Sequence, residues 1–168
     1  MNLYRDVSSN PRKLEVVQSL LQKHKDDYVL IIGTYVEQLK TISEVLKCPL
    51  IEGATPNKLR DEIFADFKLG KQKVIVVSKV ANFAVDLPNA NIAIQISGSF
   101  GSRQEEAQRI GRIMRPKGEG VEAHFYSVVT DHPAELNFAH KRQLFMTEQG
   151  YRYTIDDTQN LLDIYPST

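Results

Sequence analysis

Tyr28-Val-Leu-Ile-Ile-Gly-Thr34 is the stretch that decides the fold. Its first five residues are almost entirely apolar, which is typical of a short strand buried in a parallel sheet. Apolar residues recur at helical spacing on both sides of it, over 14–21 and over 39–46. A buried strand between two amphipathic helices is the beginning of an alternating α/β chain.

The same alternation continues to the end of the chain. Apolar runs predict further strands at 50–51, 74–77, 91–96, 123–129 and 151–155, and helical patterns cover 56–69, 102–115 and 133–149. We predict that Thr55 caps the first of these helices and that Gly70 ends it. This order implies a parallel sheet covered by helices on both faces, in one domain over 1–155. Residues 156–168 are predicted to be a tail or a remnant of a longer chain.

Composition excludes several classes of protein. The 168 residues suit one compact domain. Lys plus Arg and Asp plus Glu are both 21, so the chain is not one that coats nucleic acid through bulk charge. No apolar run approaches the roughly 18 residues of a membrane span, and the four histidines lack metal-ligand spacing. The single Cys48 fits a reducing compartment and a semi-buried apolar role rather than a reactive thiol.

Small polar residues stand where the predicted strands end. Thr34, Thr55 and Ser78 each occupy a point at which a helix or turn follows a strand. Ligands of open parallel sheets bind beyond the carboxyl ends of the strands, and hydroxyls and free N–H groups there suit phosphate. Ordinary caps and turns use the same residue types, so both interpretations stay open at this point.

A later helix carries two arginines on one face. In Gln104-Glu-Glu-Ala-Gln-Arg-Ile-Gly-Arg-Ile-Met-Arg-Pro116, residues Gln108, Arg112 and Arg115 are spaced i, i+4, i+7. Guanidinium forks can stabilise charge on a transferring phosphoryl group, and a solvated basic face is the alternative. The chain contains no G-x-x-x-x-G-K-[ST] run and no Asp-Glu pair after an apolar strand, so it lacks residues that grip ATP and Mg²⁺.

That helix resembles motif VI of superfamily-two helicases. Residues 76–88 are similar to motif V, Leu30-Ile-Ile-Gly-Thr-Tyr35 to motif IV, and residues 52–56, with Arg60 and Phe67, to the segment after motif IV. Leu3-Tyr-Arg-Asp6 and Gln149-Gly-Tyr151 resemble the XPB group within that superfamily. Over residues 3–155 the order and spacing of these segments match the second RecA-like domain of an XPB-like DNA helicase.

The resemblance implies a RecA-like three-layer α/β/α sandwich that is the C-terminal motor half of a 3′–5′ DNA helicase or translocase for DNA repair or DNA opening. Arg112 and Arg115 would reach the γ-phosphate across an interdomain cleft, beside Gln108. Asp86 would face the nucleotide. The residues implied on the DNA backbone are Thr34, Gly53, Thr55, Ser78 and Lys79.

The resemblance also implies the partners of this half. ATP and Mg²⁺ would be held mainly by a first, N-terminal RecA-like domain of the same protein, so this chain alone is expected to be inactive as an ATPase. DNA is the other implied partner, together with a nuclease or repair complex and no membrane. The location would be cytoplasmic, at the nucleoid, in a bacterium or archaeon, and nuclear in a eukaryote.

Two alternatives remain open from the sequence. One is a RecA-like adaptor that binds DNA or a partner protein without ATPase activity. The other is the motor half of a related repair, recombination or restriction translocase. A P-loop and a DExH box upstream of Met1 in the parent gene would exclude the adaptor, and different flanking domains would indicate the related translocase.

Overall fold

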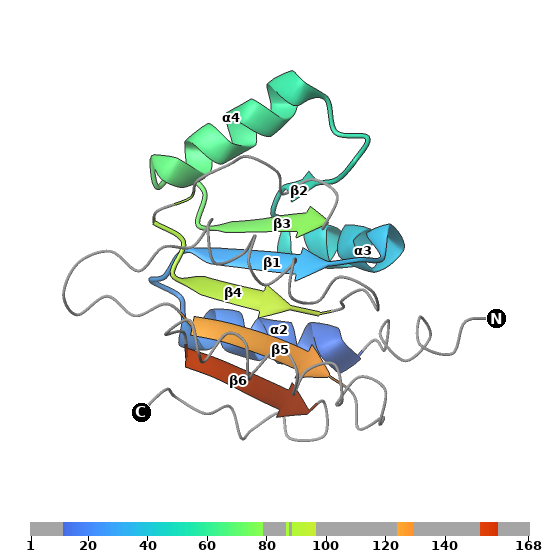
Figure 1. Cartoon of the computed structure of the whole chain (residues 1–168), viewed down its shortest axis with the longest axis vertical. Helices are drawn as coiled ribbons and strands as arrows, with labels where there is room; N and C mark the ends of the chain where they lie inside the picture. The colour runs from blue at the N-terminus through green and yellow to red at the C-terminus, as the bar shows by residue number, and fades with distance from the viewer. Residues whose placement is uncertain (1–11, 79–86, 88, 97–123, 130–151, 158–168) are drawn as a thin grey trace.

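The computed structural model describes residues 12–78, 87, 89–96, 124–129 and 152–157 (Figure 1). The elements, in chain order, are α2 (Arg12–Lys23), β1 (Val29–Gly33), α3 (Val36–Leu46), β2 (Leu50–Ile51), α4 (Asn57–Lys68), β3 (Val74–Ser78), β4 (Ile92–Gln95), β5 (His124–Val129) and β6 (Arg152–Asp157). The predicted alternation is confirmed over these residues. The helices predicted at 102–115 and 133–149 lie outside them.

The six strands form one sheet in the order β2-β3-β1-β4-β5-β6, and every pairing is parallel. In the centre, Val29 of β1 is opposite Val74 on one side and Ile92 on the other. Because all strands run the same way, their carboxyl ends share one edge, toward which all the arrowheads point in Figure 1. We call this the carboxyl edge; among the described residues it comprises Thr34, residues 53–55, Ser78 and Ile96.

Helices cover both faces of the sheet. α2 and α3 pack on one face, where Val17 and Leu39 share a core with alternate strand residues such as Ile31. α4 packs on the other face, where the centroid of the ring of its buried Phe67 lies 5.8 Å from that of Tyr28, the residue that directly precedes β1. The three-layer α/β/α sandwich predicted from the sequence is therefore confirmed.

The beginning of α4 corrects one prediction. The helix begins at Asn57 with Pro56 in the capping position, and no side chain caps its first turn. Thr55 instead closes the preceding turn: its hydroxyl oxygen accepts the N–H of Glu52 at 2.9 Å, and its own N–H donates to the Glu52 carbonyl at 3.0 Å. Thr hydroxyls bond readily to main-chain groups of their own turn, and this local bond replaces the expected helix cap.

The end of α4 is as predicted. Gly70 follows the helix with a φ of +81°, a conformation that favours glycine. A Cβ added there would lie 2.9 Å from the hydroxyl oxygen of Tyr28, so the Tyr28 side chain would have to shift. Among the described residues, the structure contains no helix with the length and apolar character needed to cross a bilayer.

Candidate functional site

Four of the predicted site residues lie on the carboxyl edge. Thr34 follows β1, Gly53 and Thr55 follow β2, and Ser78 is the last residue of β3. Ser78 is paired in register with Gly33, which directly precedes Thr34, so the ends of β1 and β3 present these two residues side by side. The other predicted residues, Lys79, Asp86, Gln108, Arg112 and Arg115, lie outside the described part of the chain.

Ser78 holds a buried hydroxyl to which the described residues offer no partner. The residue is 1 % exposed, and its Oγ has no hydrogen-bond partner within the part of the chain that the structure describes. A buried hydroxyl without a partner costs about 1–3 kcal/mol. The hydroxyl lies at the carboxyl end of a central strand, the edge at which ligands of parallel sheets bind.

The turn after β2 has a different character, because its polar groups bond to one another. The Glu52 carboxylate accepts the N–H of Ala54 at 2.6 Å, in addition to the Thr55 hydrogen bonds. That amide is therefore not available to a phosphate. Gly53 is exposed at the tip of the turn, where the lack of a Cβ permits close approach to the backbone. Thr55 Oγ1 accepts one bond, and its O–H proton can still be donated.

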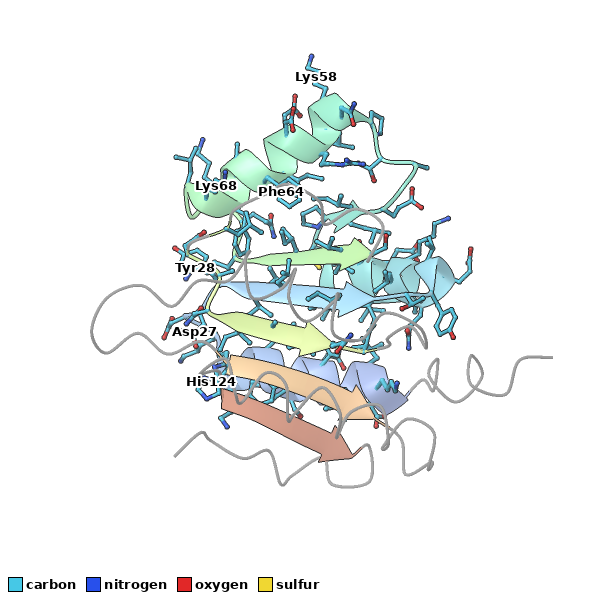
Figure 2. All side chains as sticks on the ribbon, viewed as in Figure 1. Asp27, Tyr28, Lys58, Phe64, Lys68 and His124 are labelled. Carbon is cyan, nitrogen blue, oxygen red and sulfur yellow. The ribbon has the colours of Figure 1, made fainter. Side chains whose placement is uncertain are left out.

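Arg60 is a cation near this edge that the sequence interpretation quoted only as part of a motif. It lies in the first turn of α4, immediately after the loop that leaves β2. The side chain is half-buried, and its Nε is buried with no partner among the described residues. Figure 2 shows the corresponding end of α4, marked by Lys58, on the side of the carboxyl edge, and Lys68 at the opposite end. The sequence signal that could have identified Arg60 is its position in the first turn of the predicted helix, directly after the loop that follows a predicted strand.

Lys13 is a second cation that the sequence interpretation missed. The apolar residues at helical spacing over 14–21 predict an inward stripe that begins at Leu14. In the structure the buried positions of α2 are Lys13, Val16, Val17 and Leu20. Lys13 donates a hydrogen bond from Nζ to the carbonyl of Ile96 at 2.6 Å. A hydropathy pattern counts lysine as polar and so cannot show that its methylene stem is inside the core.

The amino edge of the sheet contains a separate polar cluster. His24 pairs through Nδ1 with Asp27 at 2.9 Å and through Nε2 with the hydroxyl of Tyr126 at 2.7 Å. Asn91 donates to Asp27 at 2.8 Å and accepts the N–H of Tyr28 at 2.9 Å. Figure 2 shows Asp27, Tyr28 and His124 together on this side of the molecule. The cluster joins the end of α2 to β1, β4 and β5, which assigns it a structural role.

Cys48 also lies away from the carboxyl edge, since it precedes β2. It is 8 % exposed, and burial raises the pKa of its thiol from 9.0 to about 11, partly offset by a backbone hydrogen bond. The thiol is therefore protonated and unreactive at neutral pH. The predicted role as a small buried apolar residue is confirmed.

A fully parallel sheet of this order, covered by helices on both faces, has the RecA-like fold. Dbp5 from Saccharomyces cerevisiae, solved bound to RNA and ADP BeF3, has this fold: the TM-score is 0.66 over 88% of this chain and 39% of that one, at 15% sequence identity. At the level of family, the chain belongs to the ERCC3/RAD25/XPB C-terminal helicases, whose sequence model matches residues 4–164.

Two relatives show the degree of similarity. The "DNA 3'-5' helicase XPB" of Mycobacterium tuberculosis is 49% identical over 159 residues, which are 95% of this chain and 29% of that protein. The Saccharomyces cerevisiae "General transcription and DNA repair factor IIH helicase/translocase subunit XPB/SSL2" is 38% identical over 152 residues, 87% of this chain and 18% of that protein. The chain thus spans less than a third of the length of either relative.

Proposed function

We propose that this chain is the C-terminal motor half of an ATP-dependent 3′–5′ DNA helicase or translocase, and that its substrate site is completed by another RecA-like domain. The observation that carries the proposal is the gathering of four phosphate-compatible residues on one edge of a parallel sheet, in a chain of the XPB C-terminal helicase family. The sequence has no P-loop of its own, which fits a half that acts on a nucleotide held elsewhere.

On the DNA side, the donors are neutral hydroxyls and backbone amides with cations beside them. The Ser78 hydroxyl and the Thr55 O–H would each donate to a phosphate oxygen, and the exposed Gly53 would let the backbone approach the strand. Lys79, and Arg60 at the first turn of α4, would supply charge. Because such contacts touch the sugar–phosphate backbone, the motor would tolerate many DNA sequences.

On the nucleotide side, the proposal rests on sequence pattern and family. Arg112 and Arg115 would contact the γ-phosphate as arginine fingers, which are worth roughly 10³–10⁵ in rate. Gln108 shares their predicted face and would couple nucleotide state to closure, and Asp86 would face the nucleotide. ATP and Mg²⁺ would be held mainly by the N-terminal RecA-like domain.

Turnover would then follow from domain closure. ATP draws the two domains together, because the arginines complete the site only when the cleft shuts, and hydrolysis with product release reopens it. Since each domain holds the DNA backbone, alternating closure moves the motor along the strand. A repair complex, a nuclease or a transcription factor assembly of the kind named for the yeast relative would be the setting for this activity. The location would be the nucleoid or the nucleus.

The test compares this chain alone with the full-length protein. With ATP, Mg²⁺ and single-stranded DNA, the isolated chain is expected to release no phosphate above the rate without protein, whereas the full-length protein shows DNA-stimulated release. Turnover by the purified chain alone would contradict the half-motor proposal. A full-length protein that binds DNA but never hydrolyses ATP would favour the adaptor alternative.

A further inference from the structure

Lys13 stands out because it is a charged residue in a fully buried position. Its exposed fraction is 1 %, and its ammonium donates to the main-chain carbonyl of Ile96 across a sequence separation of 83 residues. Val16, Val17 and Leu20 continue the same buried face of α2. Lysine is almost never fully buried in proteins unless its charge is compensated, because removing an ammonium from water is costly.

Stability alone does not explain the choice of lysine. Position 13 belongs to an inward stripe at i, i+3, i+4 and i+7, where an apolar side chain such as leucine or methionine would bury without any desolvation of charge. Replacing buried ionic groups by apolar residues of similar volume is often neutral or stabilising. A buried ammonium at such a position therefore indicates a requirement for its specific contact.

The contact is made at the point where the ladder between two central strands ends. β1 and β4 are paired from Val29 opposite Ile92 to Ile32 opposite Gln95, and the N–H of Ile96 still donates to the carbonyl of Ile32 at 2.9 Å. The carbonyl of Ile96, the residue that directly follows β4, accepts a hydrogen bond from the ammonium. Ile96 is thus held on both its amide and its carbonyl group, at the carboxyl edge.

The position of Ile96 connects this contact to the site. It directly follows β4 and is the last residue of the described stretch 89–96, and in the sequence the chain continues from it to Gln108, Arg112 and Arg115. Across the sheet, Ile96 continues the row of Gly33 and Ser78, so that the clamped carbonyl lies on the same edge as the DNA-facing candidates. A change in backbone direction at Ile96 would therefore displace the residues that follow it in the chain.

We propose that Lys13 is a positioning residue for turnover: its ammonium fixes the carboxyl end of β4 and so sets the direction in which the chain leaves the sheet toward the nucleotide-facing arginines. This role rests on the proposed motor function. Because Lys13 is 1 % exposed, the proposed role acts through the Ile96 carbonyl and needs no contact with nucleotide or DNA. A charge-assisted hydrogen bond to a main-chain oxygen suits this task, because it is shorter and stronger than a bond between neutral groups.

The main test is Lys13→Met in the full-length protein. Methionine keeps an unbranched stem and good helix propensity but cannot donate a hydrogen bond. We expect the kcat of DNA-stimulated ATP hydrolysis to fall about tenfold, which corresponds to about 1.4 kcal/mol, while the KM for ATP and the Kd for DNA stay within about twofold. The melting temperature should be unchanged or higher. Lys40→Met on the exposed face of α3 is the matched control and should change none of these.

Two outcomes would overturn the proposal. One is a Lys13→Met protein whose kcat is within about twofold of the wild type. The other is a parallel loss of kcat, DNA affinity and melting temperature, which is the signature of a purely structural residue. If the Lys13→Met protein does not fold, Lys13→Leu replaces it, because leucine also fills the buried face of α2 and cannot donate a hydrogen bond. The same two outcomes would then overturn the proposal.

Hydrogen exchange separates this proposal from the motor function on which it rests. In Lys13→Met the amide of Ile96, bonded to the Ile32 carbonyl, is expected to exchange about tenfold faster, whereas the amides of β3 keep their wild-type rates. Unchanged exchange at Ile96 would overturn the clamp even in an active motor. A wild-type protein without DNA-stimulated ATPase would overturn the motor function, and the exchange result would still decide whether Lys13 fixes the strand end.

Discussion

Ser78→Ala gives the sharpest prediction for the DNA side of the site, because the described residues offer this hydroxyl no partner. The side chain is 1 % exposed and its Oγ has no partner among the described residues. Deleting an unpaired buried hydroxyl removes a desolvation cost of about 1–3 kcal/mol and leaves only a small cavity. We therefore expect the free energy of unfolding to stay constant or to rise by about 1 kcal/mol.

The same substitution should weaken DNA binding. A hydrogen bond from a hydroxyl to a charged phosphate oxygen is worth about 1.5–3 kcal/mol, or roughly 10- to 100-fold in affinity. The hydroxyl is neutral and releases no counterion, so the slope of log affinity against log salt concentration should not change. Fluorescence anisotropy with labelled single-stranded DNA, repeated over a series of salt concentrations on the full-length protein, measures both quantities, and urea unfolding measures the stability.

Ser43→Ala is the matched control with the opposite expectation. The Ser43 hydroxyl donates to the carbonyl of Cys48, away from the carboxyl edge. Its loss should cost about 1 kcal/mol of stability and leave DNA affinity unchanged. The reasoning about Ser78 would be refuted by a Ser78→Ala protein that behaves like this control, with reduced stability and wild-type affinity for DNA.

Two further predictions concern Thr55 and Cys48. Thr55→Ala removes both the acceptor for the Glu52 N–H and the O–H donor, so it should weaken DNA binding about fivefold. Thr55→Ser keeps the hydroxyl, and its DNA affinity should stay within about twofold of the wild type. Equal losses of affinity in both variants would exclude the hydroxyl from the DNA interface. Cys48, with its pKa raised to about 11, should react with iodoacetamide roughly 100-fold more slowly than an unfolded peptide at neutral pH. Below pH 9 the thiol is protonated in both states, and from pH 9 to 11 the unfolded state ionises first, so stability should fall as pH rises through this window. Urea unfolding over that window, with Cys48→Ala as the variant that lacks this contribution, checks the sign.

Much of the fold follows from hydrophobic pattern, because burial on both faces leaves a signal that is local in sequence. The apolar run over 28–32 contains all of β1 except Gly33, and each described strand overlaps a predicted one. The order of the strands in the sheet does not follow from such runs, since pairing depends on contacts between distant segments. β6 ends at Asp157, two residues past the predicted domain boundary at 155, and that boundary stays a prediction.

The site is predicted less completely, for physical reasons that differ between residues. The carboxyl edge follows from strand direction, which places Thr34 and Ser78 on the same side once the sheet is parallel. Whether a hydroxyl is free to meet a ligand is not a local property: Thr55 bonds within its own turn, and Ser78 has no described partner. Lys13 was missed because its burial depends on the angle of α2 against the sheet, which shifted the inward stripe by one residue.

The central claim is that this chain completes an ATPase site from across a cleft, and Arg115 is the residue through which it is tested most directly. In the full-length protein, we predict that Arg115→Ala lowers the kcat of DNA-stimulated ATP hydrolysis by roughly 10³-fold or more, while the affinity for a non-hydrolysable nucleotide changes far less. An Arg115→Ala protein that hydrolyses ATP at the wild-type rate would contradict the account.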